Sequence, residues 1–497
     1  MSKLTKISFL LALFFGLDKI VGILRQVIIV RQFGLSANLD AFNVANNLPD
    51  LLYAMISGGA LAIALIPVLS EALSNDGKKA LWSLFSRIAN LAFVVTAFLA
   101  VLIVIFAPNL VGWKYGIAPG FNEQQRVIVI NLMRLDLIAT LVFSISGMVM
   151  AGLQANQHFF FPAMAPILYN VGQIVGAVFF VPIWGVYGLA YGVILGAFLH
   201  LLIQVPALIM NQFTWIPSLG LKDIYVIKVL KLMGPRVISI FFIQLTFLVR
   251  DNLASRLQQG SVSALTYGWM IQQVPETLIG TAIGTALLPT LSELVAAKED
   301  SQFKETIERA VKVLIAITIP IAVIGALGLR PFIEVVFKLP AEQTDLLLWV
   351  TRGYLVGLLG QSVLETIVRS FYARQNAIFP MLGSLLNLLI YIGLGSILIH
   401  EMGAVGISLT DSIAFTIQPL FLILVLNKQL KSAISTGWIP LKGILAGLAA
   451  AAAMLIFSAI SQQIHLPALV AGILNVLLGL VVSAPFVWKE ARLLLKL

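Results

Sequence analysis

The stretch that decides the fold is ISGGALAIALIPVLSEAL at residues 56–73, because a second version of it, IGTAIGTALLPTLSEL, follows at residues 279–294. Aligned at an offset of 222 residues, the two place a proline, a serine and a glutamate of one copy over the same residues of the other. Self-similarity at a fixed offset is the signature of a duplicated structural unit.

Two further matches follow in the same order. LQANQHFFFP at 153–162 returns as YARQNAIFP at 372–380, and GVYGLAYG at 185–192 returns as GAVGISLT at 403–410. Both matches are 218 residues apart. Each would be weak alone, but three matches at nearly one offset predict that most of the chain consists of two copies of one unit.

The composition predicts an all-α integral membrane protein. With 60% hydrophobic and 11% charged residues, the chain has more apolar surface than a soluble fold of 497 residues can bury. Its apolar runs are each about 20 residues or longer, enough to cross the hydrocarbon layer as helices. Fourteen such helices are predicted, at residues 5–31, 40–73, 79–109, 125–153, 160–181, 186–210, 229–256, 263–296, 304–328, 346–373, 377–399, 404–427, 443–463 and 467–488.

These helices divide into two lobes and an appendix. Residues 1–210 hold the first copy and residues 211–430 the second, each with six helices, and residues 431–497 hold the last two. Because six is even, both copies have the same orientation and are related by a pseudo-twofold axis along the membrane normal. Parallel repeats that enclose a polar cavity are typical of secondary transporters. The first apolar run lacks a nearby cleavage site, so it is interpreted as a retained helix.

The net charge of +10 is a signal of topology. Alternate loops place sixteen basic residues on the side of the N-terminus and six on the other. By the positive-inside rule, both termini are cytoplasmic, and a nucleic-acid role is disfavoured. The sequence has no cysteine and no histidine metal motif, phosphate loop or dinucleotide fingerprint, so we expect neither an enzyme nor a cofactor or metal site.

The first helix is unusually charged for its environment, at GLDKIVGILRQVIIVRQFG, residues 16–34. Charges inside a membrane tend to face a protein interior or a wet cavity. Asp18 could neutralise Lys19 or Arg25 inside the bundle; alternatively, Lys19 and Arg25 form a cationic cavity wall. Arg31 lies at the helix end and is interpreted as an interface anchor.

Further polar residues mark candidate binding positions in both copies. Asp40 either caps the second helix or faces the cavity, and Asn43 and Asn47 follow it. In the second copy Gln272, Gln273 and Glu276 lie around Pro275. Two pairs are predicted to neutralise each other: Arg250 with Asp251, and Glu365 with Arg369.

The region from Gly22 to Leu69 resembles the lipid II flippase family, MurJ or MviN. The family pattern is G-x-x-R-x-x-x-x-A-x-x-F-G, then D-A-F-x-V-A-x-x-x-P-x-L-L and G-A-x-x-x-A-x-x-P-x-L, and this region matches it except at Val30, where the pattern has alanine. FYARQN at 371–376 also resembles a family motif, and the resemblance spans roughly residues 5–430. It implies the multidrug/oligosaccharidyl-lipid/polysaccharide exporter fold, with two six-helix lobes, a central cationic cavity and two final helices that form a groove for a lipid tail.

The resemblance also implies roles for single residues. The two basic residues of the family's first helix fall on Lys19 and Arg25, and its second-helix aspartate falls on Asp40. Two cavity arginines of the family are replaced, by Tyr53 and by Met270, and an acidic position falls on Gln273. The chain is therefore similar to a divergent member of the family.

We therefore expect an alternating-access flippase of the bacterial cytoplasmic membrane that moves lipid II to the outer leaflet. The alternative is an exporter of another undecaprenyl-pyrophosphate-linked oligosaccharide. The expected partners are the lipid-linked saccharide and membrane lipids, and the chain is expected to act as a monomer. The predicted substrate-binding residues are Lys19, Arg25, Asp40, Asn43, Asn47, Tyr53, Gln272, Gln273 and Glu276.

Overall fold

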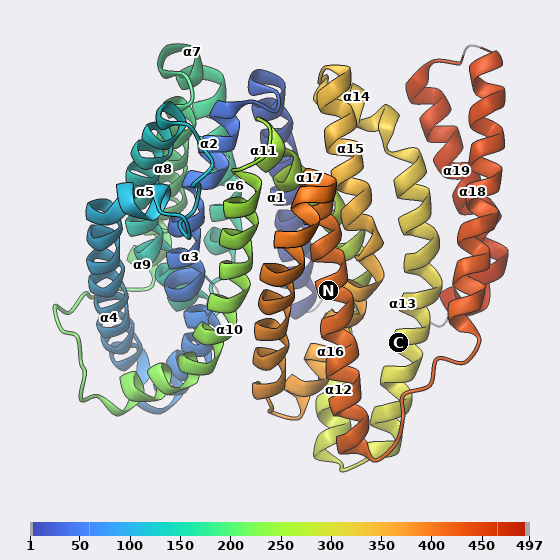
Figure 1. Ribbon diagram of the computed structural model, residues 1–497. Helices are drawn as coiled ribbons and strands as arrows, with labels where there is room; N and C mark the ends of the chain where they lie inside the picture. The colour runs from blue at the N-terminus through green and yellow to red at the C-terminus, as the bar shows by residue number, and fades with distance from the viewer. Residues whose placement is uncertain (1–2, 59, 465, 493–497) are drawn as a thin grey trace. The chain divides into compact units, whose positions relative to one another are not determined.

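The computed structural model describes residues 3–58, 60–464 and 466–492, and every regular element among them is a helix (Figure 1). The chain forms two compact units, Met1–Gln259 (unit 1) and Gly260–Leu497 (unit 2). Unit 1 contains α1 (Lys3–Phe33), α2 (Ala37–Ala45), α3 (Asn47–Leu52), η1 (Tyr53–Gly58), α4 (Ala60–Gly112), α5 (Glu123–Ala155), α6 (Phe160–Val175), η2 (Gly176–Phe180), α7 (Val181–Trp184), α8 (Tyr187–Leu202), α9 (Val205–Met210) and α10 (Ile224–Ala254). Unit 2 contains α11 (Ser261–Glu276), η3 (Thr277–Thr281), α12 (Ala282–Ala296), α13 (Asp300–Gly328), α14 (Arg330–Phe337), α15 (Ala341–Val356), α16 (Leu358–Ala373), α17 (Ile378–Leu430), α18 (Ile439–Gln463) and α19 (Ala468–Ala491).

The predicted all-helical membrane architecture is confirmed, whereas the number of spans is not. Ten helices within the described residues are long and apolar enough to cross a membrane, or eleven if the bent pair α15 and α16 is one span. The prediction places one segment before and one after Gly77, and likewise around Gly403. At both glycines the backbone is not helical, although α4 and α17 continue through them. The ten also leave out α1. The count of fourteen therefore stays a prediction.

The backbone repeats along with the sequence. Gln157 and Gln375, 218 residues apart, both adopt a left-handed conformation, with φ of 59° and 55°. Gly185 and Gly403, also 218 apart, break their helices with φ of 58° and 56°. The π-helical segments η1 and η3 occupy overlapping places in the two copies at the 222-residue offset. Equivalent turns and helix distortions thus recur in each copy, as duplication of one unit requires.

Unit 1 is held together around α4, α5, α6 and α8. Trp82, Phe85 and Phe213 stack edge to face around the base of α4, with ring centroids 5.3–5.5 Å apart. α6 and α8 approach closely through glycines, since a Cβ on Gly172 would lie 2.3 Å from the Cα of Gly196. Small residues at such contacts let helix backbones pack closely in membranes. This contact fixes two of the helices that form the pocket described below.

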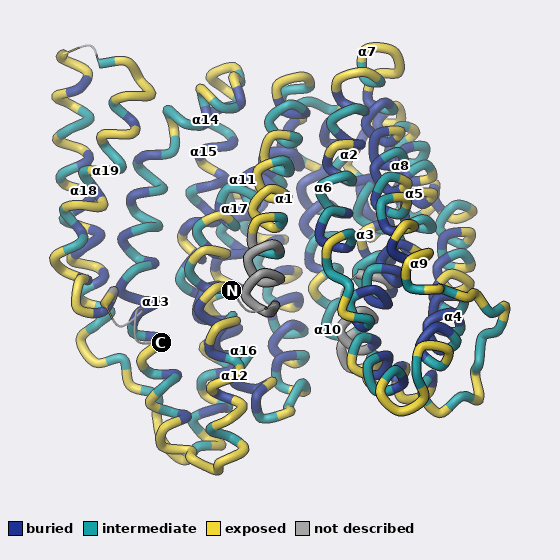
Figure 2. The backbone as a smooth tube through the Cα atoms, turned by 180° about the vertical axis from the view of Figure 1, so that it is seen from behind, coloured by how far each residue is buried: buried dark blue, intermediate teal, exposed yellow. Residues whose placement is uncertain are grey.

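The last two helices, α18 and α19, pack against α13 within unit 2. Ala450 and Met454 of α18 are buried with Ile324 of α13. The other faces of α18 and α19 are exposed and apolar, with Leu448 at 61% and Val481 at 67% exposure, as helices that contact lipid require (Figure 2). In unit 1, α10 packs against α4, although it follows the lobe boundary predicted at residue 210. The predicted lobe boundaries stay a prediction.

Candidate functional site

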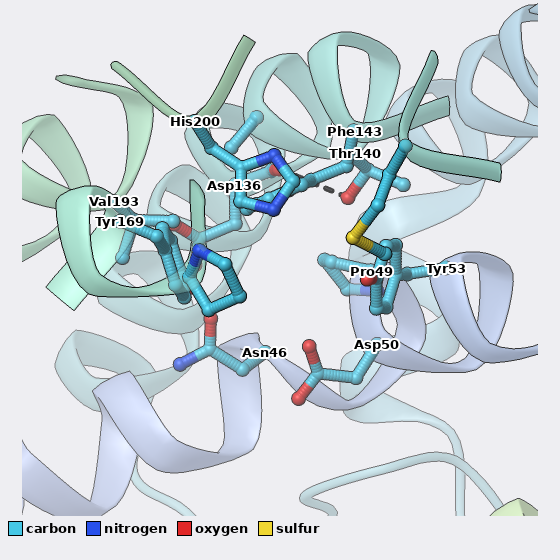
Figure 3. Close-up of a pocket in the computed structure, with 13 residues that line it drawn as sticks. Asn46, Pro49, Asp50, Tyr53, Asp136, Thr140, Phe143, Tyr169, Val193 and His200 are labelled. Carbon is cyan, nitrogen blue, oxygen red and sulfur yellow. Dashed lines mark hydrogen bonds between the residues drawn. The ribbon is translucent and has the colours of Figure 1, made fainter. Parts of the chain in front are cut away.

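A pocket of about 240 Å³ in unit 1 gathers the ionisable groups of several helices (Figure 3). It is lined by residues of α3, η1, α5, α6 and α8, and its aromatic wall includes Phe143. Its polar lining comes from Asn46, Asp50, Tyr53, Asp136, Thr140, Tyr169 and His200. A concave site with a few polar groups in an apolar wall is the usual form of a small-molecule or ion site.

The π-helical turn η1 positions Tyr53 at this pocket. α3 begins after Asn46, whose amide nitrogen donates to the carbonyl of Phe42 at 3.0 Å, and Pro49 lacks a backbone N–H. The helix then widens into η1, which begins at Tyr53. The Tyr53 ring contacts Phe143 of α5 at a centroid distance of 5.2 Å. π-helical turns of this kind occur frequently at functional sites.

Asp136 of α5 is the most isolated acid of the pocket. Its side chain is 2% exposed, and neither carboxylate oxygen has a hydrogen-bond partner among the described residues. The hydroxyl of Thr140, one turn later, donates to the backbone carbonyl of Asp136 at 3.1 Å and leaves the carboxyl group without that donor. Asp50 also lines the pocket and interacts electrostatically with Asp136, but it is exposed.

His200 is held in one orientation by Ser146 of α5 and by Gln204, the residue before α9. The amide nitrogen of Gln204 donates to the backbone carbonyl of His200 at 2.8 Å and to the hydroxyl of Ser146 at 3.0 Å. The Ser146 oxygen lies 2.5 Å from Nδ1 of His200. Ser146 and Gln204 together hold His200 as an oriented member of the pocket wall.

The charged residues of α1 are not paired with each other. Asp18 accepts a hydrogen bond from the amide of Asn170 in α6 at 2.8 Å, and the described residues include no ion pair of Asp18 with Lys19 or Arg25. Lys19 is exposed. Arg25 is half-buried, and its Nε is buried without a hydrogen-bond partner in the described structure. The described structure thus has no ion pair between Asp18 and either basic residue, and the cationic cavity wall of Lys19 and Arg25 stays a prediction.

Arg25 lies near the pocket described above. Its charge acts on the carboxylate of Asp50 and on the phenol of Tyr169. Arg31, at the end of α1, is exposed, as expected for an anchor at the membrane surface. Because a guanidinium group is a fork of donors that matches phosphate oxygens, Arg25 is suited to bind an anionic head group.

The three predicted binding residues of α2 and α3, Asp40, Asn43 and Asn47, differ in burial and in hydrogen bonding. Asp40 is 1% exposed in the first turn of α2, but the helix cap is Ser36, whose side chain accepts from the backbone of Leu39, so capping by Asp40 is wrong. Asn43 is half-buried in the same helix. Asn47 donates to the carboxylate of Asp251 in α10 at 2.7 Å. Neither Asp40, Asn43 nor Asn47 lines the pocket of unit 1.

The predicted pair Arg250 and Asp251 is confirmed, with Nε of the arginine 2.8 Å from the carboxylate. Both residues are buried, and Asn47 supplies a second donor to Asp251. The pair Glu365 and Arg369 in α16 is also confirmed. The Asn47 amide is thus used for contact between α3 and α10 inside unit 1.

In unit 2 the predicted polar residues of α11 bind each other and α16. Gln272 is buried and donates to Gln361 at 2.8 Å, and Gln273 donates to Gln272 at 3.2 Å. Glu276 is 2% exposed, and its carboxylate accepts from the hydroxyl of Thr281 at 3.1 Å across η3. These three residues form a polar cluster of hydrogen-bonded groups within one unit.

Unit 2 also contains an almost wholly apolar pocket of about 510 Å³. It is formed by α11, η3, α13, α14 and α19, with Leu278, Ile324, Phe332 and Leu480 in its wall. Leu278 is 73% exposed there. Such a surface can contact an acyl or isoprenoid chain without leaving polar groups unpaired.

Sequence reasoning missed four ionisable residues of the unit 1 pocket: Asp50, Asp136, Tyr169 and His200. Asp136 could have been found, because an acid in the middle of an apolar span marks a functional position. His200 belongs to no histidine motif in the sequence. Its role depends on the packing of α8 against α5, which no local pattern contains.

Comparisons with known proteins identify the family of the chain. The family model described as lipid II flippase MurJ matches residues 29–475. The lipid II flippase MurJ of Burkholderia cenocepacia is 27% identical over 436 residues, which cover 85% of this chain and 84% of that protein. A probable lipid II flippase MurJ of Thermotoga maritima is 26% identical over 430 residues, which cover 85% of each.

Solved structures share the fold. A lipid II flippase MurJ in an inward closed conformation matches with a TM-score of 0.78 and 22% identity, over 97% of this chain and 99% of that one. An inward-facing multidrug transporter of the MATE family matches with a TM-score of 0.71 and 14% identity, over 83% of this chain and 94% of that one. Since the family model covers nearly the whole chain, this protein belongs to the lipid II flippase MurJ family.

Proposed function

We propose that this protein moves lipid II from the inner to the outer leaflet of the bacterial cytoplasmic membrane. The observation that carries the proposal is the match of the MurJ family model to residues 29–475, together with relatives named as lipid II flippases over more than four fifths of the chain. The same relatives favour lipid II over another undecaprenyl-linked oligosaccharide. The role is one of transport, with no chemical change in the lipid.

In this proposal Lys19 and Arg25 bind the pyrophosphate of the lipid. Both are basic residues of α1 without an ion-pair partner in the described chain, and the Nε of Arg25 is buried without an acceptor. Lysine supplies a point charge and arginine a planar pair of donors, and both suit phosphate oxygens. With tyrosine at position 53 and methionine at 270, these two cations carry more of the binding than they would beside two further arginines.

The apolar pocket of unit 2 holds part of the isoprenoid tail. Its wall includes α19, one of the two helices that lie outside the repeat. An apolar tail that stays in contact with this surface avoids exposure to water while the polar head group crosses. Alternating access then exposes the head group first to the cytoplasm and later to the outside, with both termini cytoplasmic and the chain acting as a monomer.

The test is reconstitution of the full chain in liposomes that carry fluorescent lipid II. A membrane-impermeant reagent that destroys the label scores head groups that reach the outer leaflet. A second set of liposomes carries another undecaprenyl-pyrophosphate-linked glycan. Faster exposure of lipid II than in protein-free liposomes supports the proposal. Exposure of the other glycan without exposure of lipid II would overturn it.

A further inference from the structure

The pocket of unit 1 contains an acid for which the proposed transport of a lipid anion gives no role. Asp136 lines the pocket, is 2% exposed, and has both carboxylate oxygens buried without a hydrogen-bond partner in the described structure. Figure 3 shows it beside His200, whereas Asp50 lies beside Asn46. Asp136 is thus a buried polar side chain at a cavity large enough for several water molecules.

A bare carboxylate cannot persist in this position without compensation. Removing an ionised carboxyl group from water is unfavourable unless a cation or several donors replace the water. No lysine or arginine lines the pocket. The charge of Arg25 interacts with Asp50 and Tyr169. The hydroxyl of Thr140 donates to the backbone carbonyl of Asp136 and not to its carboxylate. The described chain therefore supplies nothing that neutralises Asp136, and the compensating positive charge must come from outside it.

The remaining groups favour a proton over a metal cation. The described residues include no group of three or more histidine, cysteine, aspartate or glutamate side chains arranged to hold a metal ion. Asp50, a second carboxyl group in the same pocket, interacts electrostatically with Asp136. Two neighbouring carboxyl groups favour retention of a proton on one of them. Because Asp50 is exposed and Asp136 is buried, a proton can pass from solvent to the carboxyl group of Asp50 and from there to that of Asp136.

Other ionisable groups lie on α5 itself and on the elements packed against it. On α5, Arg134 is exposed and donates to the backbone carbonyl of Val104 at 3.2 Å. The neighbouring helices place the following side chains in the pocket wall: Asp50 from α3, Tyr53 from η1, Tyr169 from α6 and His200 from α8. On α4, Glu71 and Arg87 form ion pairs with Lys228 and Asp223, and Asp76 accepts from Tyr225. Asp40 of α2 is buried but does not line the pocket, and α9 has no ionisable residue.

The second copy of the repeat shows that the fold does not need these acids. At the repeat offsets, Asp50 corresponds to Gln272, Asp136 to Tyr354, Tyr169 to Asn387 and His200 to Gln418. There, Asn387 donates to Gln418 at 3.1 Å, and Gln272 donates to Gln361 at 2.8 Å. In the second copy three of these four positions thus hold neutral amides and the fourth a tyrosine, whereas the first copy has two carboxyl groups, a tyrosine and a histidine. Packing alone therefore does not explain the acids.

We propose that Asp136 is the centre of a proton-binding site in unit 1, which takes up and releases one proton through the pocket that Asp50 also lines. The site is separate from the basic residues assigned to the lipid pyrophosphate. Its existence does not depend on which lipid is transported. Its ligand is a proton, and occupation by sodium is an alternative that experiment can distinguish.

The test is infrared difference spectroscopy of the purified full-length protein as the pH is changed. A protonated carboxyl group has a carbonyl stretch that an ionised one lacks. We expect this signal to titrate in the unmodified protein and to be lost in Asp136→Asn. The matched control is Asp18→Asn, in which the oxygen that accepts from Asn170 is kept, and this variant should retain the signal. Circular dichroism checks the helical content of each variant.

Asp136→Glu covers the case in which the asparagine variant does not fold. It keeps a carboxyl group but moves it, so the signal should persist at a changed frequency. An unchanged signal in Asp136→Asn, an unchanged frequency in Asp136→Glu, or no titrating carboxyl signal in the unmodified protein would overturn the proposal. Loss of the signal with sodium chloride, but not with potassium chloride at the same pH, would identify a sodium site instead and would also overturn it.

Discussion

Replacing Arg25 with glutamine removes the half-buried charge of α1 while keeping a polar side chain of similar length. The Nε of Arg25 has no acceptor in the described structure, so the substitution breaks no internal hydrogen bond of that atom. A hydrogen bond to a charged group contributes about 1.5–3 kcal/mol. Because 1.4 kcal/mol is tenfold in an equilibrium constant, we expect Arg25→Gln to weaken pyrophosphate binding by roughly 10- to 150-fold.

The assay is equilibrium binding of a water-soluble, short-chain lipid II analogue to the purified protein, followed by the liposome assay. Arg25→Lys keeps the charge but loses the planar pair of donors. Its affinity for the lipid II analogue should therefore lie between those of the unmodified protein and of Arg25→Gln. Arg31→Gln, at the exposed end of the same helix, is the control and should bind normally. Normal binding and transport by Arg25→Gln would refute the assignment of the pyrophosphate to α1.

Three further substitutions test the fold and the tail pocket. Asp251→Ala removes the carboxylate that pairs with the buried Arg250 and should lower the free energy of unfolding by about 3–5 kcal/mol. Thermal unfolding in detergent measures this effect, and an unchanged midpoint would contradict the buried pair. Gly176→Ala places a Cβ 2.4 Å from a backbone atom of α8 and should lower the free energy of unfolding by about 1–3 kcal/mol. A Cβ on Gly16 would have no atom within 4 Å, so Gly16→Ala is the control and should not destabilise the protein. Equal effects of the two substitutions would contradict the close contact. Leu278→Asn should reduce photocrosslinking of an isoprenoid probe to unit 2, whereas Leu424→Asn, 68% exposed on α17 and outside the pocket, should not.

Much of the architecture could be predicted because it depends on patterns that repeat along the chain. The apolar runs predict membrane helices, and the offset between residues 56–73 and 279–294 predicts two copies of one unit. The left-handed turns at Gln157 and Gln375 were not predicted individually, yet they fall at the predicted offset. The number of spans differs because α4 and α17 continue through Gly77 and Gly403, where the sequence predicts separate helices.

The pocket of unit 1 was less predictable, because its residues come from five separate elements. Tyr53 was selected through the family resemblance, and it does line the pocket. Asn47 was selected for its polarity, but the structure uses it to bind Asp251. Both are polar residues near the same proline, so their sequence positions alone do not distinguish them. What separates them is the side of the helix on which α5 or α10 packs.

The π-helical segments η1 and η3 also record the order of events in the history of the chain. A π-helical turn accommodates one residue more than an α-helical turn, and both copies have one at overlapping positions. The simplest history is a single insertion in the ancestral unit before it was duplicated. The contrast between Asp50 and Gln272 arose after duplication, because identical copies cannot differ in charge. The two copies therefore share this helix distortion while they differ in charge beside it, and the third π-helical segment, η2, has an α-helical counterpart in α17.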